Sequence, residues 1–219
     1  MTSAAAGEYL RVSALHAYYG ESHILHGIEF TVNRGELVTL LGRTGSVRVG
    51  GRETVALTPH RIARLGIGYC PEERGIFASL SCEENLMLPP QVGSAGVSIG
   101  EIYRMFPQLE ARRASPGTRL SGGEQQMLAI ARILRAGAEL LLLDEVTEGL
   151  APVIVHALGR VIGQLKTRGY TIVLVEQNFR FASSVAYRHY VMEHGRVVYI
   201  IPNAELGACM AKLHDYLGV

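Results

Sequence analysis

The sequence contains no apolar run long enough to cross a bilayer. Its longest apolar runs, such as Leu140 to Leu143 and Thr171 to Val175, fall far short of the roughly 20 residues that a spanning helix needs. Residues Met1 to Gly7 are small and polar, without the basic region or apolar stretch of a signal peptide. We therefore expect a cytoplasmic protein that reaches a membrane only through a partner.

A strong charge of one sign is also missing, and cysteine is scarce. The chain has 21 basic and 20 acidic residues, for a net charge of +1, whereas nucleic-acid binders usually carry a large basic excess. No nucleic-acid partner is expected. The three cysteines (Cys70, Cys82 and Cys209) are scattered, odd in number and in no metal-ligand spacing. They favour a reducing compartment and ordinary packing over a disulfide framework.

The chain is long enough for one large domain over residues 1–219, or for a core that carries a smaller subdomain, and its pattern is that of an α/β protein. Hydrophobic residues make up 48% of the chain and charged residues 19%. In the second half, apolar residues at helical spacing (from Met127 to Leu134, and from Ala157 to Leu165) alternate with the apolar strands Leu140 to Leu143 and Thr171 to Val175. This alternation predicts a parallel sheet covered by helices on both faces, with its sites at the carboxyl ends of the strands.

The first half and the end of the chain predict other elements. Short strands at Tyr9 to Ser13, Gly27 to Asn33 and Glu36 to Leu41 indicate an antiparallel patch. Thr58 as N-cap, Pro59 as first helical residue and Gly66 as stop predict a short helix before a strand at Ile67 to Cys70. Ile102, Met105, Phe106 and Leu109 have helical spacing, and a hairpin turning at His194-Gly195 precedes a short terminal helix.

The most specific segment is Leu120-Ser121-Gly122-Gly123-Glu124-Gln125-Gln126, directly before the helix that contains Met127. One interpretation is a capping box, in which Ser121 accepts from the Glu124 amide and the Glu124 side chain reaches back. That explains the serine and the glutamate but not the two glycines between them. The other interpretation is an anion site, because glycines at a helix start let a phosphate approach the exposed amides and the positive end of the helix dipole.

A second segment places two carboxylates, Asp144 and Glu145, at the end of the buried strand Leu140 to Leu143. Such a pair can hold a magnesium ion and an attacking water, although a solvated strand end would look the same.

Together these two segments resemble the signature and Walker B motifs of ABC ATPases. The resemblance implies that Ser121, Gly122, Gly123 and Glu124 meet ATP, that Asp144 coordinates Mg2+ and that Glu145 polarises water. The string Val146-Thr147-Glu148-Gly149-Leu150-Ala151-Pro152 resembles the D-loop of branched-chain amino-acid importers, with Val146 where the family usually has proline.

Three weaker elements agree with this resemblance. Glu72, in a stretch from Gly68 to Phe77 that resembles the Q-loop, stands at the usual glutamine, and Gln177 stands at the histidine of the H-loop. Both replacements are common in the branched-chain subfamily. Gln177 can contact a phosphate through its amide but cannot carry a proton as histidine does. Tyr19 stands where the family stacks an aromatic ring on adenine, although a lone tyrosine is more often a core residue.

The family's phosphate-binding loop, Gly-x-x-x-x-Gly-Lys-Ser/Thr, is absent. Counting from Gly42, which would open the loop, the second glycine and the lysine fall on Val47 and Arg48. Arg48 lies in a stretch that resembles the strand after the P-loop helix. The gap is equivalent to an excision between Arg43 and Thr44 that removes a loop and a helix, on the order of 20 residues.

The resemblance implies a P-loop NTPase-like ABC ATPase fold: a parallel core sheet, an antiparallel β subdomain and a helical subdomain near residues 78–135, without the P-loop helix. It also implies ATP and Mg2+ as cofactors, a second ATP-binding subunit, transmembrane permease subunits docked near Glu72, an indirectly coupled periplasmic binding protein, and a place on the inner face of the plasma membrane.

Several roles remain open at this point. The chain is an ATP-hydrolysing subunit of a branched-chain amino-acid importer, with its competence questioned by the missing loop, or a non-catalytic subunit that donates its signature motif to a heteromeric transporter. A urea or amide importer subunit and a soluble ABC protein acting on nucleic acid or the ribosome are the further alternatives.

Overall fold

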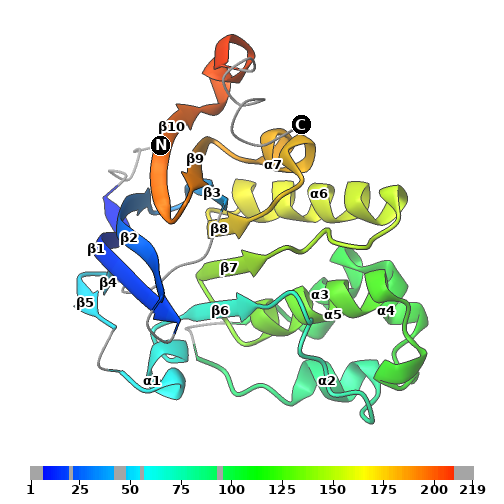
Figure 1. Ribbon diagram of the computed structural model, residues 1–219. Coiled ribbons are helices and arrows are strands. Elements are labelled where there is room, and N and C mark those ends of the chain that lie inside the picture. Colours follow the sequence, from blue (N-terminus) through cyan, green and yellow to red (C-terminus); the bar gives the residue numbers. More distant parts are fainter. Residues whose placement is uncertain (1–6, 20–21, 42–47, 55–56, 93–95, 210–219) are drawn as a thin grey trace, which may run out of the picture. The chain divides into compact units, whose positions relative to one another are not determined.

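The computed structural model describes residues 7–19, 22–41, 48–54, 57–92 and 96–209 (Figure 1). The chain divides into two compact units. The first unit is formed by Met1–Leu57 with Lys166–Val219, and the second by Thr58–Leu165.

An antiparallel sheet in the order β2-β1-β4-β5 begins the first unit. Its members are β1 (Glu8–Tyr19), β2 (Ser22–Asn33), β4 (Arg48–Val49) and β5 (Arg52–Glu53). The alternating Ile28, Phe30 and Val32 are all buried, which fits a strand with one face in the core. The predicted antiparallel patch is therefore confirmed for its first two strands, but the prediction was wrong for Glu36 to Leu41, which pairs in parallel in the other sheet. The first two strands form a much longer hairpin than the sequence pattern indicated.

The rest of the first unit is built on β3 (Leu37–Leu41), which pairs in parallel with both β8 (Thr171–Val175) and β9 (Arg188–Glu193). The predicted hairpin is confirmed: β9 continues through the His194-Gly195 turn into β10 (Arg196–Pro202). A short helix, α7 (Phe179–Val185), joins β8 to β9. A 3-10 turn follows β10 at Asn203–Glu205, and the end of the predicted terminal helix lies outside the described residues.

The second unit contains a parallel strand pair, β6 (Ile67–Cys70) with β7 (Leu140–Asp144). Leu140, Leu141 and Leu143 are all but inaccessible, as expected for a strand covered on both faces. Gly68 of β6 has a packing reason, because a Cβ there would lie 2.8 Å from both Ile133 and Ala138. The carboxyl end of the helix Gly122–Arg135, which contains Ile133, therefore packs closely against β6.

The α-helices of the second unit lie along the chain in the order α1 (Pro59–Ala63), α2 (Cys82–Met87), α3 (Ile99–Met105), α4 (Pro107–Ala111) and α5 (Gly122–Arg135), and α6 (Pro152–Thr167) follows β7. The apolar residues Ile102, Met105, Phe106 and Leu109 are buried as expected. They span two helices rather than one, because Phe106 lies between α3 and α4 with a non-helical φ of −130° and Pro107 starts the next helix. The Thr58 side chain makes no capping hydrogen bond to α1, so the predicted N-cap contact is wrong in this detail.

The three cysteines are free, and Cys70 and Cys82 are fully buried. The packing role that their spacing suggested is confirmed.

Candidate functional site

The start of α5 is closed by a complete capping box. The Ser121 hydroxyl accepts from the Glu124 amide at 3.3 Å, and the Glu124 carboxylate accepts from the Ser121 amide at 2.7 Å and from its hydroxyl at 2.8 Å. Burial works against ionisation of Glu124, but the bonds from Ser121 and the nearby Arg112 outweigh it and lower the pKa of this carboxyl. The ionised Glu124 carboxylate therefore caps the first turn of its own helix.

The two glycines of this segment have different surroundings. Gly123 is buried, and a Cβ there would lie 2.7 Å from the Ile154 side chain at the start of α6. Packing alone therefore requires a glycine at this position, a reason that the sequence did not reveal. Gly122 is only partly buried, and a Cβ there would come within 3.3 Å of the Arg74 guanidinium.

Arg74 is a neighbour of this helix start that the sequence did not indicate. Its Nη1 donates to the Gln125 side-chain oxygen at 3.3 Å. Its φ of +67° is uncommon for a residue with a side chain, and such conformations are concentrated at functional sites. The guanidinium and the first-turn amides of α5 together give this surface a positive electrostatic character, which favours an anion.

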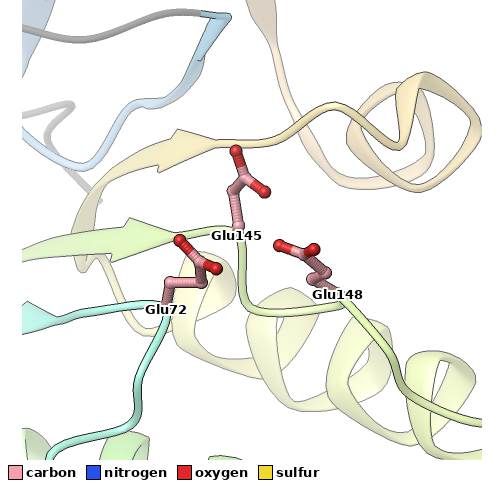
Figure 2. A group of neighbouring side chains, drawn as sticks. All are labelled: Glu72, Glu145 and Glu148. Atoms are coloured by element: carbon pink, nitrogen blue, oxygen red, sulfur yellow. The ribbon is translucent and has the colours of Figure 1, made fainter.

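Three carboxylates meet beyond the carboxyl ends of β6 and β7. One oxygen from each of Glu72, Glu145 and Glu148 lies within 4.8 Å of the others, and Figure 2 shows the three side chains pointing toward one another. A hydrogen bond with Glu145 and the negative charges of Glu72 and Glu145 raise the pKa of Glu148. Glu145 itself has a φ of +46°, a second uncommon backbone conformation at this edge.

Asp144 lies beside this group but makes a different contact. Its Oδ2 accepts from the Tyr69 hydroxyl at 3.1 Å. Burial, followed by the charge of Asp144, raises the pKa of Tyr69 to about 12, so the phenol keeps its proton and remains a donor at neutral pH. The trio of converging oxygens therefore consists of Glu72, Glu145 and Glu148, whereas the sequence assigned the metal to Asp144.

This donor set fits a hard divalent cation. Magnesium prefers carboxylate oxygens, and a cation would relieve the repulsion that raises the pKa of Glu148. Glu72, Glu145 and Glu148 would hold it, with Asp144 adjacent. Neither Glu148 nor Tyr69 was singled out from the sequence; only the charge of Glu148 three residues after Glu145 could have indicated its place.

The remaining predicted residues belong to the first unit. Gln177 follows β8, with an exposed side chain and a backbone carbonyl that accepts from the Phe179 amide at 2.8 Å. The next residue, Asn178, caps α7 by accepting from the Phe181 amide at 3.1 Å. Tyr19 is the last residue of β1, and its side chain lies outside the description; Gly42 lies outside the described residues altogether.

The sequence offers no lysine for a phosphate-binding loop. The chain contains only two lysines, Lys166 and Lys212, and neither follows a glycine. The Lys166 ammonium donates to the Val185 carbonyl at 2.9 Å and lies 3.5 Å from the centre of the Tyr187 ring. Lys212 lies outside the described residues. The sequence therefore does not supply the lysine that the phosphate-binding loop of this family uses.

Comparison with solved structures defines the fold. A structure described as the ADP conformation of MJ1267, an ATP-binding cassette of an ABC transporter, superposes with a TM-score of 0.76 at 17% identity and covers 97% of this chain and 100% of the other. At that identity the likeness establishes the fold alone: an ABC ATPase cassette.

Sequence relatives establish the family. Residues 43–148 match the ABC transporter family. The high-affinity branched-chain amino acid transport ATP-binding protein BraG of Pseudomonas aeruginosa is 37% identical over 211 residues, covering 86% of this chain and 91% of its own length. The probable branched-chain amino acid transport ATP-binding protein LivF of Archaeoglobus fulgidus is 32% identical, with coverages of 87% and 90%. This chain belongs to the ABC transporter family, as one of its ATP-binding subunits.

The alignment with BraG also measures what is missing. Its 211 positions cover 86% of 219 residues, which is about 188, so about 23 positions have no counterpart in this chain. That difference agrees with the excision of a loop and a helix inferred from the absent motif.

Proposed function

We propose that this chain is the signature-donating ATP-binding subunit of an importer for branched-chain amino acids. In this role it pairs with a second ATP-binding subunit that has an intact P-loop and offers it the start of α5. The observation that carries the proposal is the contrast between a fully capped signature helix at Ser121 and a sequence without a phosphate-binding lysine.

The geometry at Ser121 supports this role. The 14-residue helix α5 points its first-turn amides and the positive end of its dipole toward the residues Ser121, Gly122 and Gly123. The capping box fixes Ser121, and the packing of Gly123 on Ile154 fixes the second glycine, so little order would have to be gained when phosphates of the partner's ATP arrive. Arg74 adds a positive charge beside Gly122.

The carboxylates have a second role in the proposal. A bound Mg2+ would supply charge neutralisation beside Glu72, Glu145 and Glu148. Glu145 would orient a water, and Gln177 and Tyr19 would contribute to nucleotide contacts in the first unit. Because the family sandwiches ATP between the P-loop of one subunit and the signature of the other, the three carboxylates would serve the nucleotide position that lacks its loop.

The names of the relatives supply the proposed cargo class. The proteins from P. aeruginosa and A. fulgidus are both named for branched-chain amino acid transport. Among the described residues no helix is long and apolar enough to cross a bilayer. In the proposal, this chain docks near Glu72 on the cytoplasmic face of permease subunits, which transport the cargo. A periplasmic binding protein is coupled to the chain only through these permease subunits.

Nucleotide binding tests the proposal. The purified chain is titrated with a fluorescent ATP analogue and Mg2+, first alone and then in equimolar mixture with an ATP-binding subunit encoded beside it. We expect no saturable binding by the chain alone and micromolar binding by the mixture. Micromolar binding by the isolated chain would contradict the proposal and would favour the alternative of a subunit that binds its own ATP.

The cargo is tested separately. Cells that express the chain, its partner and their permease subunits are assayed for uptake of labelled leucine and labelled urea. Leucine uptake that depends on this chain is expected, and uptake of urea alone would reassign the cargo.

A further inference from the structure

Three histidines gather on one side of the β1–β2 hairpin, in the first unit and outside the site described above. His16 Nδ1 and His23 Nε2 are 3.0 Å apart. The rings of His23 and His26 lie with their centroids 4.0 Å apart, and those of His16 and His23 are 5.1 Å apart. His16 is exposed and the other two are half-buried, so solvent reaches the group.

A bulge brings the three rings to one face. Residues three apart on a regular strand, such as His23 and His26, point to opposite faces. Here Leu25 pairs with Ala17 and His23 with Tyr18, which leaves Ile24 as an extra residue in β2. The extra residue reverses the alternation of side chains along β2, so His23 and His26 lie on the same face of the hairpin. His16 pairs with His26 across the hairpin and lies on that face as well.

The backbone under His26 is held in place from two directions. A second irregularity follows at Gly27, whose φ of +68° few other residues adopt. The His26 amide donates to the Gly195 carbonyl at 2.8 Å, in the turn between β9 and β10. Only glycine fits at position 195, because a Cβ there would lie 1.9 Å from the Ile24 carbonyl oxygen. The hairpin therefore presents the imidazoles on a fixed scaffold.

The chemistry of the group is that of a transition-metal ligand set. Neutral imidazole nitrogens bind Zn2+, Ni2+ and Cu2+, whereas Mg2+ prefers oxygen. The contact of 3.0 Å between His16 and His23 is close to the separation of two nitrogens on one tetrahedral ion, about 3.3 Å from Zn–N distances of about 2.0–2.1 Å.

We propose that His16, His23 and His26 form a binding site for a divalent transition metal of the Zn2+ class. His16 and His23 supply a nearly preformed pair of ligands, and His26 supplies the third. The ring nitrogens of the three histidines do not yet all lie within 4.8 Å of one another; among the described residues only the acidic trio meets that distance. The His26 ring must therefore turn about its side-chain bonds to reach the ion. Three protein ligands leave a fourth position for water. Binding would clamp β1 to β2, independently of nucleotide.

Calorimetric titration with ZnCl2 at pH 7.5 tests the site, on protein purified without a histidine tag. We expect one Zn2+ per chain with micromolar affinity, and a melting temperature raised by saturating Zn2+. His23→Gln and His16→Gln should each weaken binding at least tenfold and remove the melting shift. His194→Gln, in an exposed residue of another hairpin, and Glu148→Gln, in the acidic trio, serve as matched controls and should leave the affinity unchanged.

The control variants also identify the contrary result. No binding at about 100 μM Zn2+, a concentration far above a micromolar dissociation constant, would overturn the proposal. Loss of binding in Glu148→Gln with retention in His23→Gln would overturn it as well, because the metal would then belong to the carboxylates. Melting curves without metal show that each variant is folded before it is titrated.

Discussion

The two compact units carry different parts of the ABC ATPase machinery, and they have been preserved unequally. The unit Thr58–Leu165 retains a capped signature helix, the strand that ends at Asp144 and a group of three converging carboxylates. The other unit retains β3, after which the phosphate-binding loop of the family is expected, but the sequence that follows lacks the lysine of that motif. In the proposed role, the groups that would act on a partner's nucleotide are present, whereas the lysine that would bind the chain's own nucleotide is missing from the sequence.

The largest expected effect comes from repairing the deficient unit. Insertion of a Gly-x-x-x-x-Gly-Lys-Thr loop and a helix between Arg43 and Thr44 should create ATP binding in the isolated chain. Two charge-assisted hydrogen bonds at about 1.5–3 kcal/mol each correspond to about 100-fold or more in affinity. Fluorescent-nucleotide titration measures it. The same insertion with alanine in place of the lysine is the control, and equal binding by both would refute the assignment of the gap.

A smaller effect is expected from the packing of the preserved unit. Gly123→Val should reduce the free energy of unfolding by about 1–3 kcal/mol, because the new side chain meets Ile154 at a distance that no real Cβ tolerates. Gly163→Ala, in the middle of α6 with nothing within 4 Å, is the matched control and should add about 0.5–1 kcal/mol. Urea unfolding measures both. Equal effects of the two substitutions would show that Ile154 does not constrain the signature helix.

Acid should weaken the first unit through one buried imidazole. His189 lies between the Thr39 hydroxyl at 2.7 Å and the Asn203 side chain at 2.8 Å, and burial lowers its pKa. The unfolded chain therefore binds this proton more readily, so stability is complete above about pH 6.5 and falls as pH decreases toward the lower pKa of the folded state. The slope is at most about 1.4 kcal/mol per pH unit.

Urea unfolding between pH 5 and 8 measures this slope, and His189→Gln should reduce it. An unchanged slope in His189→Gln would assign the acid sensitivity to another group.

The smallest effect is expected at the edge of the preserved unit. Tyr69→Phe removes the bond to Asp144, but the ring is 55% exposed and solvent replaces much of the interaction. A loss of about 0.5–1 kcal/mol in the free energy of unfolding is expected. Thermal melting with and without Mg2+ measures it, and a loss several times larger would give Tyr69 a structural role that its exposure does not suggest.

Elements with strong local signals could be predicted from the sequence. The capping box at Ser121, the apolar strand before Asp144 and the His194-Gly195 turn follow from local rules and are present. The length of the β1–β2 hairpin could not be predicted, because its alternation is broken by the extra residue Ile24 and such bulges have no sequence signature.

Contacts between distant residues were the other limit. The convergence of Glu72 with Glu145 and Glu148 depends on the pairing of β6 with β7, and the steric requirement for Gly123 depends on where α6 begins. The resemblance to a family placed Glu72 in the site. It assigned no role to Glu148, Tyr69 or Arg74 within its D-loop and Q-loop stretches, and their contacts come from tertiary structure.

The most direct test uses a mixed pair of this chain with an intact partner subunit and measures ATP turnover. Ser121→Asp keeps an N-cap residue but sets a negative charge against the phosphates. In this chain it should lower turnover by about 100-fold, comparable to the loss of a transition-state donor. The same change in the partner's signature serine should have little effect, because that serine faces the position without a P-loop. The reverse pattern, or equal damage by both, would contradict the assignment of this chain as the signature donor.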